Sequence, residues 1–192
     1  MTYRHIALMG RAESGKDTVG RRLVREWQFT RVAFADPLKE MALRVDPVVT
    51  CEPAGYGPLP VRLSQVVRRW GWEKAKRRCP EVRGILQRLG QSVRDQNPDH
   101  WLSLAMKKVA VADAWNLPVV MTDVRYVNEC EALKARGFVL VRVNRPGAPD
   151  LGENGNHVSE SELSDYPAEL MVSNIGTLAD LGRAADRLVR HR

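Results

Sequence analysis

The stretch "HIALMGRAESGKDT", residues His5 to Thr18, decides the fold of this chain. Its first part is short and apolar, ends at Gly10 and is typical of a buried strand. From Lys16 onward apolar residues recur at helical spacing, with arginines between them. The apolar positions are Val19, Leu23, Val24 and Trp27. The sequence therefore predicts a strand, a glycine-bounded loop and a helix, in that order.

The spacing Gly10-x4-Gly15-Lys16 between a strand and a helix is typical of a phosphate-binding loop. Glycines let successive backbone N–H groups converge on one anion, and the helix N-terminus adds its positive end. Lys16 adds a full charge that can follow phosphates during transfer. The alternative is an ordinary glycine turn with a surface lysine. The candidate nucleotide-binding residues are Gly10, Arg11, Ser14, Gly15, Lys16, Asp17 and Thr18.

Asp17 occupies a position where such loops usually carry a serine or threonine. A carboxylate can bind magnesium directly or through water, so Asp17 can replace the hydroxyl, with Thr18 holding phosphate or metal. Alternatively, Asp17 only provides the negative charge that is favourable in the first turn of a helix. The sequence leaves both interpretations open.

Four further apolar stretches resemble strands and alternate with helical sequence. They are "RVAFAD" (31–36), "LPVVMTD" (117–123), "FVLVRVN" (138–144) and "AELMVSN" (168–174). Near-continuous apolar strands separated by helices indicate a parallel sheet covered on both faces. Thr177 can cap a last helix with the apolar stripe Leu178, Leu181, Ala185 and Leu188. We predict one three-layer α/β domain over residues 1–192, with a parallel sheet of about five strands.

Two segments interrupt the alternation of strands and helices. Residues 46–116 begin with sequence rich in Pro and Gly, continue with Arg-rich helical sequence, and are predicted to be a helical insertion. Residues 145–163 contain a polar loop that is too long for a simple connection, and loops of this kind are often lids. The three scattered cysteines have no metal-ligand spacing and are expected to be free thiols in a reducing cytoplasm.

The formal net charge is +7, and arginines cluster between Arg62 and Arg94. A solvated basic face, a nucleic-acid surface and a site for the phosphates of a small ligand would each explain this charge. Charge alone does not decide between them. No apolar run approaches membrane-spanning length, so we expect no membrane association.

The predicted helix "PEVRGILQRLGQSVRDQ", residues 80–96, carries two parallel rows of side chains. The apolar row contains Val82, Leu86, Leu89 and Val93, and the second row contains Arg83, Gln87, Gly90 and Arg94. The rows lie about a quarter-turn apart, so one can pack on protein while the other presents guanidinium and amide groups. The second row suits a monophosphate and its base, with Gly90 allowing close approach. The alternative is a solvated charged face.

The motif "DVRYVNE" follows the strand at 117–123 and places Asp123 at the carboxyl end of that strand, where open parallel sheets bind ligands. Arg125 and Glu129 are four residues apart, close together if a helix begins near Val127. Arginine forks suit the charge of a migrating phosphoryl group. A purely structural Arg–Glu pair at a helix start is the alternative.

Five stretches together resemble the bacteriophage deoxynucleoside monophosphate kinases, a family of P-loop kinases. They are "GRAESGKDT", "FADPLKE", "LQRLGQSVRDQNPDHW", "DVRYVNE" and "HVSESEL", and they span most of the chain. The resemblance implies ATP- and magnesium-dependent phosphorylation of a deoxynucleoside monophosphate. Its implied partners are small nucleotides in the host cytoplasm, with no stable nucleic-acid complex, and the family allows a homodimer.

The resemblance also implies roles for the candidate residues. Residues Gly10 to Thr18 bind ATP, and the catalytic residues are Lys16, Asp123, Arg125 and the lid residue Arg145. Magnesium is held by Asp17, Thr18 or Asp123. The acceptor nucleotide is bound by Asp36, Lys39, Arg83, Gln87, Gly90, Arg94, Trp101 and Glu129. Asp36 and Lys39 are explained equally well as a helix start, and Trp101 either stacks on a base or fills core.

Rival functions remain at this stage. Phosphomevalonate kinase of the animal type and dephospho-coenzyme A kinase are P-loop kinases that act on other small molecules, and neither explains "LQRLGQSVR" as well. A rival from another class is a basic nucleic-acid-binding protein that uses ATP as a switch. That protein would show strong, salt-sensitive binding to DNA.

Overall fold

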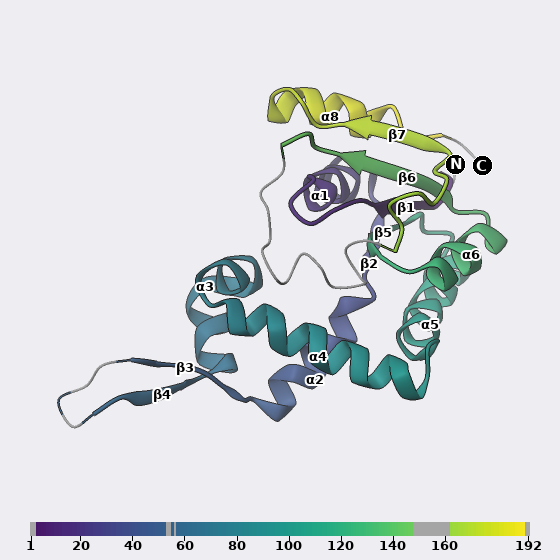
Figure 1. The fold of residues 1–192 in the computed structure, drawn as a ribbon. Helices are drawn as coiled ribbons and strands as arrows, with labels where there is room; N and C mark the ends of the chain where they lie inside the picture. Colours follow the sequence, from purple (N-terminus) through teal and green to yellow (C-terminus); the bar gives the residue numbers. More distant parts are fainter. Residues whose placement is uncertain (1–2, 53–54, 56, 148–161, 191–192) are drawn as a thin grey trace. The chain divides into compact units, whose positions relative to one another are not determined.

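Five parallel strands form the main sheet, in the order β2-β5-β1-β6-β7 (Figure 1). They are β1 (Ile6–Met9), β2 (Thr30–Val32), β5 (Val119–Val124), β6 (Val139–Asn144) and β7 (Leu170–Ser173). Each lies within one of the five stretches that the sequence analysis identified as a strand, apart from Thr30 at the start of β2 and Val124 at the end of β5, so the predicted parallel sheet is confirmed. Because the strands are parallel, their carboxyl ends lie along one edge of the sheet.

The computed structural model describes residues 3–52, 55, 57–147 and 162–190. It divides into two units that each have their own buried core. Unit 1 comprises Met1–Phe34 and Leu102–Arg192 and contains the five-stranded sheet, and unit 2 comprises Ala35–Trp101.

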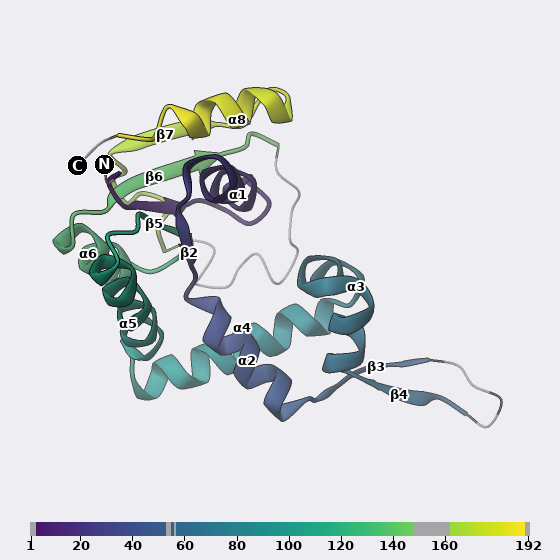
Figure 2. The same cartoon turned by 180° about the vertical axis from the view of Figure 1, so that it is seen from behind.

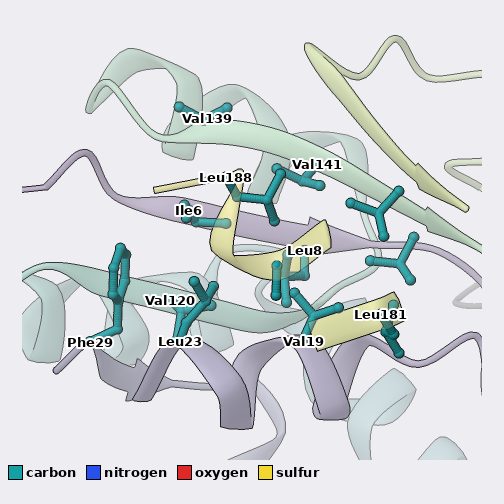
Figure 3. Close-up of a cluster of buried hydrophobic side chains, with 13 residues drawn as sticks. Ile6, Leu8, Val19, Leu23, Phe29, Val120, Val139, Val141, Leu181 and Leu188 are labelled. Carbon is teal, nitrogen blue, oxygen red and sulfur yellow. The ribbon is translucent and has the colours of Figure 1, made fainter. Parts of the chain in front are cut away.

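Helices cover both faces of the sheet in unit 1. Alternate residues of a strand point to opposite faces, so Ile6 and Leu8 share one face and Ala7 and Met9 the other. Helices α1 (Lys16–Trp27) and α8 (Leu178–Asp186) pack on the Ile6 face, as Figure 3 shows. Helices α5 (His100–Ala114) and α6 (Val127–Ala135) lie on the other face, and all four strand residues are fully buried. The buried cluster on the Ile6 face anchors α1, and with it the loop that precedes α1.

Helix α8 begins as predicted but differs in its apolar face. Thr177 caps the helix, because its hydroxyl accepts a hydrogen bond from the Asp180 N–H. Leu181, Ala185 and Leu188 are buried, whereas Leu178 is 77% exposed. The prediction that Leu178 belongs to the buried stripe is therefore wrong. A residue in the first turn can satisfy the helical spacing and still lie beyond the edge of the surface on which the helix packs.

Unit 2 contains three helices and a two-stranded antiparallel hairpin, seen from behind in Figure 2. The elements are α2 (Ala35–Val45), β3 (Val48–Glu52), β4 (Leu59–Arg62), α3 (Leu63–Arg78) and α4 (Pro80–Gln96). The range of α4 is the predicted one. The hairpin was not predicted, because its sequence is rich in Pro and Gly. Pro60 lies opposite Cys51 in a ladder of two strands only, where a residue without an N–H is tolerated.

A small core holds unit 2 together. Its buried members are Ala42, Val49, Leu63, Val66, Ala75, Cys79 and Val82. These residues come from α2, β3, α3 and α4 and the turn between the last two, so one cluster joins all three helices to the hairpin. Among the helices that the structure describes, none combines the length and apolar character that crossing a bilayer requires.

Gly20 in α1 tests how closely α1 packs on the sheet. A Cβ atom at Gly20 would lie 2.5 Å from Cγ2 of the buried Thr122 on β5. We expect Gly20→Ala to lower the free energy of unfolding by about 1–3 kcal/mol through overpacking. Gly182→Ala in α8 is the matched control, because no heavy atom lies within 4 Å of its added Cβ. That variant should gain up to about 1 kcal/mol from the higher helix propensity of alanine. Urea unfolding measures both values, and changes of the same sign would contradict this packing.

Candidate active site

The loop between β1 and α1 follows a path that only glycine allows at two positions. Gly10 has φ 140° and Gly15 has φ 107°, both in the left-handed region. A Cβ at Gly10 would lie 2.3 Å from the Val143 carbonyl oxygen, and one at Gly15 would lie 2.7 Å from Asn174 Nδ2. The ends of β6 and β7 therefore pack directly against the backbone of this loop.

Lys16, the first residue of α1, folds back over the loop. Its ammonium group donates hydrogen bonds to the carbonyl oxygens of Gly10 and Arg11, at 2.7 Å and 2.6 Å. The side chain is buried, with 7% of the residue exposed. Gly15 is the N-cap of α1, and no side chain of the described residues caps the helix there. This combination of a cation and a helix N-terminus suits an anion.

Ser14 and Thr18 provide hydroxyl groups, and Asp17 provides a carboxylate in the first turn of α1. Ser14 is 2% exposed, and its hydroxyl has no hydrogen-bond partner among the residues that the structure describes. Asp17 is exposed and Thr18 is half-buried, both in the first turn of α1. A buried hydroxyl of this kind commonly has a partner, such as a ligand atom.

Asp123 lies at the carboxyl end of β5, next to the start of the loop. Met9 pairs with Val124 across β1 and β5, so the ends of these two strands are level. The Asp123 carboxylate accepts a hydrogen bond from the Phe34 N–H at 3.0 Å, which fixes it at the carboxyl edge of the sheet. The phosphate loop and Asp123 therefore belong to the same edge of unit 1.

Glu129 supports the backbone of Arg125. One oxygen of the Glu129 carboxylate accepts from the Arg125 N–H at 2.8 Å and from the Tyr126 N–H at 3.1 Å. Glu129 is only 2% exposed and lies in the first turn of α6, which begins at Val127 as expected. Burial, followed by the charge of Glu129, raises the pKa of the Cys130 thiol to about 12, so this thiol stays protonated and is a poor nucleophile.

Arg145 follows β6 directly and reaches the phosphate loop. Its guanidinium donates to the Glu13 carbonyl oxygen at 3.4 Å, while the side chain remains exposed. Arg142 instead donates to the carbonyl oxygens of Leu163 and Tyr166, which ties β6 to the segment before β7. Most of the predicted lid, residues 148–161 with His157, Ser159 and Glu160, lies outside the described residues.

Apart from Glu129, which lies on α6 in unit 1, the predicted acceptor residues lie in unit 2. Arg83, Gln87 and Arg94 are half-buried on α4. Asp36 and Lys39 lie in the first turns of α2, with 3.6 Å between the Lys39 ammonium and the Asp36 carboxylate. The same Lys39 ammonium lies 5.9 Å from the ring centroid of Trp72.

Gly90 and Trp101 have packing contacts in the structure. A Cβ at Gly90 would lie 3.1 Å from Leu38 Cδ2, so the glycine lets α4 approach α2 closely. Trp101 is 4% exposed, and its indole N–H donates to the Gly90 carbonyl oxygen at 3.2 Å. These contacts explain both residues without a ligand, and their roles in acceptor binding stay predictions.

Sequence reasoning missed Asn174, which donates a hydrogen bond to the Ser14 carbonyl oxygen at 2.9 Å. The available signal was a polar residue at the carboxyl end of a predicted strand, the same signal that identified Asp123. Within the described ranges, no three His, Cys, Asp or Glu side chains gather to hold a metal ion.

Comparisons with known proteins support a nucleotide-kinase reading of this geometry. Residues 71–184 match the family described as deoxynucleotide monophosphate kinase. A protein of Acanthamoeba polyphaga mimivirus, whose name assigns it to the deoxynucleotide monophosphate kinases, is 29% identical to this chain over 170 residues. The matched region covers 82% of this chain and 81% of the mimivirus protein. An uncharacterized protein of Ictalurid herpesvirus 1 is 31% identical over 101 residues, 51% of this chain and 42% of its own.

The fold resembles that of a solved P-loop kinase. Dephospho-CoA kinase from Campylobacter jejuni superposes with a TM-score of 0.51 at 9% identity, covering 96% of this chain and 95% of that protein. At this identity the similarity concerns the fold alone. The family match begins at residue 71, so it includes α4 and the Asp123–Glu129 motif but not the phosphate loop.

Substitutions at Glu129 test how much its hydrogen bonds to the Arg125 and Tyr126 N–H groups stabilise the fold. Glu129→Ala leaves two N–H groups without their acceptor, and we expect it to lower the free energy of unfolding by about 1–3 kcal/mol. Glu129→Gln should lose clearly less, because a single oxygen accepts both hydrogen bonds and the amide oxygen can replace it. Urea unfolding of the two variants and the parent measures the difference. Equal losses would show that these two hydrogen bonds contribute little.

Proposed function

We propose that this chain, which belongs to the deoxynucleotide monophosphate kinase family, transfers the γ-phosphoryl group of ATP to a deoxynucleoside monophosphate. The products are ADP and a deoxynucleoside diphosphate. Family membership identifies an ATP-dependent nucleotide kinase with a P-loop kinase fold. The observation that carries the proposal is the Lys16 ammonium over a glycine-fixed loop, on the same sheet edge as Asp123 and Arg125.

The residues of unit 1 act on the donor nucleotide. The backbone N–H groups between Gly10 and Thr18 bind its terminal phosphates, and Lys16 neutralises charge on the group being transferred. Arg125, held by Glu129 through its backbone, and Arg145, next to the loop at Glu13, supply further positive charge. The glycine-fixed backbone of the loop is in place before the nucleotide binds, so binding requires little rearrangement there.

Magnesium fits the donor set of this site. Asp17, Thr18 and Asp123 offer carboxylate and hydroxyl oxygens, the hard ligands that this ion prefers. The described residues form no cage of three or more ligating side chains, which is typical of magnesium bound mainly by phosphates and water. When bound, the ion neutralises charge on the phosphates of the donor.

The residues of unit 2 bind the acceptor nucleotide. Arg83 and Arg94 supply guanidinium groups for its phosphate, and Gln87 supplies an amide for hydrogen bonds to its base or sugar. Asp36 and Lys39 are further candidates on α2. The acceptor phosphate is already ionised near neutral pH, because its second pKa is about 6, so the reaction needs no strong general base.

The test is to incubate the protein with ATP, magnesium ions and each deoxy- or ribonucleoside monophosphate, and to resolve the products by ion-exchange chromatography. We expect at least one deoxynucleoside diphosphate, formed in equal amount with ADP. Dephospho-coenzyme A and phosphomevalonate serve as alternative acceptors, and duplex DNA binding is measured in parallel. If the protein phosphorylated dephospho-coenzyme A or phosphomevalonate, the proposal would be wrong. It would also be wrong if no nucleoside monophosphate were phosphorylated.

Lys16→Ala tests the donor site. Removing a cation that acts on the transferring group should lower kcat at least about 100-fold. The circular dichroism spectrum should stay that of the parent, because the hydrogen bonds from the ammonium to the Gly10 and Arg11 carbonyl oxygens lie within the loop rather than in the core. Retention of full activity would show that the loop assignment is wrong.

Arg83→Ala and Arg94→Ala test the acceptor site. Each removes a charge-assisted contact to phosphate, so the KM for the deoxynucleoside monophosphate should rise about tenfold or more, while the KM for ATP changes little. Arg88→Ala is the matched control, since Arg88 lies exposed on the same helix and pairs with Glu81. If Arg88→Ala raised the acceptor KM as much as the other two, net charge rather than a specific contact would be responsible.

A further inference from the structure

Asn174 links the last strand to the phosphate loop. It directly follows β7, and its own N–H donates to the Asn144 carbonyl oxygen at the end of β6, at 2.7 Å. Its side chain donates from Nδ2 to the Ser14 carbonyl oxygen at 2.9 Å. A carbonyl oxygen can only accept, so the group of the Asn174 amide that faces it must be the NH₂.

The contact between Asn174 and the loop leaves no spare room. A Cβ at Gly15 would lie 2.7 Å from Asn174 Nδ2 and 3.1 Å from Leu181 Cδ2. The amide therefore lies directly against the peptide that joins Ser14 to Gly15. Ser14 lies outside the helix, and its carbonyl precedes the Gly15 carbonyl that accepts from the Thr18 and Val19 N–H groups. The Asn174 side chain thus supplies the Ser14 carbonyl with a partner from another strand.

The Ser14 C=O and the Gly15 N–H belong to the same peptide, so the contact with Asn174 also determines the direction of the Gly15 N–H. In a planar trans peptide the C=O and the N–H point in opposite directions, and the described backbone has no cis peptide bond. Holding the Ser14 C=O on the Asn174 side therefore turns the Gly15 N–H to the opposite side. Gly15 is the N-cap of α1, where the helix presents its positive end.

We infer that Asn174 is a positioning residue for the phosphoryl donor: it fixes the peptide between Ser14 and Gly15 so that the Gly15 N–H donates to the β-phosphate of ATP or ADP. The inference rests on the proposed function, because it takes the loop as the donor site. Asn174 acts through the loop and does not itself touch the nucleotide phosphates. The buried Ser14 hydroxyl, without a partner among the described residues, belongs to the same corner of the loop.

The test is Asn174→Leu, which keeps the approximate size of the side chain and removes its donor. We expect the Kd for ADP, measured by isothermal titration calorimetry, to rise about tenfold, as for loss of one well-oriented hydrogen bond to a charged group. The KM for ATP should rise by a similar factor, and the KM for the acceptor monophosphate should change less than about twofold. Ser173→Ala is the matched control, because its side chain is exposed on β7 next to Asn174.

The outcomes separate a positioning role from a structural one. A residue needed only for folding would lower the melting temperature and the active fraction, and therefore kcat, while leaving both KM values unchanged. Wild-type values of the ADP Kd and ATP KM in a folded Asn174→Leu variant would overturn the inference. If the parent protein bound no ADP and phosphorylated no nucleotide, the proposed function itself would fail, and this inference with it.

A second measurement uses the unchanged protein and does not depend on how the variant folds. In ¹⁵N-labelled protein, ADP should shift the backbone amide resonance of Gly15 downfield, because its N–H gains a charged acceptor. The acceptor monophosphate should leave that resonance in place. A Gly15 resonance that ADP does not shift, in protein that calorimetry shows to bind ADP, would also overturn the inference.

Discussion

The structure depends on the loop that joins β1 to α1. At Gly10 and Gly15 this loop has no room for a Cβ atom. Carbonyl and amide atoms from the ends of β6 and β7 occupy the space that side chains at Gly10 and Gly15 would need. Glycine at these two positions therefore lets the backbone of the loop lie directly against the ends of β6 and β7. In the proposed function, the N–H groups of this loop bind the phosphates of ATP, and a loop that is already fixed does not have to be ordered first.

The parallel sheet then assembles the remaining groups. The carboxyl ends of β1, β5, β6 and β7 lead into the phosphate loop, Asp123, Arg145 and Asn174, which are far apart in the sequence. Hydrogen bonds from Phe34 to Asp123 and from Asn174 to Ser14 tie these strand ends to one another or to the loop. Phosphoryl transfer requires charge to be placed in advance rather than covalent intermediates, and in the proposed function the carboxyl edge of the sheet provides that placement.

Local patterns predicted the elements of this fold well. Apolar runs identified all five parallel strands, and spacing identified α4 with its bounds, because burial and periodicity are properties of a short stretch of chain. The hairpin of β3 and β4 was missed because Pro60 and its neighbours resemble a loop, and Leu178 fits the helical stripe but lies exposed. The partners in contacts between distant segments could not be predicted from local patterns: the packing of Gly90 against Leu38 and the hydrogen bond from Asn174 to Ser14 depend on the tertiary structure.

A crystal structure of the protein with ADP and magnesium ions tests the central claim most directly. The account predicts that oxygens of the β-phosphate lie within about 2.7–3.2 Å of the Lys16 ammonium and of backbone nitrogens in the Gly10–Thr18 loop. The Gly15 nitrogen should be among them, with the Ser14 carbonyl still on Asn174. A β-phosphate bound elsewhere on the protein, with the loop amides left to solvent, would contradict the account.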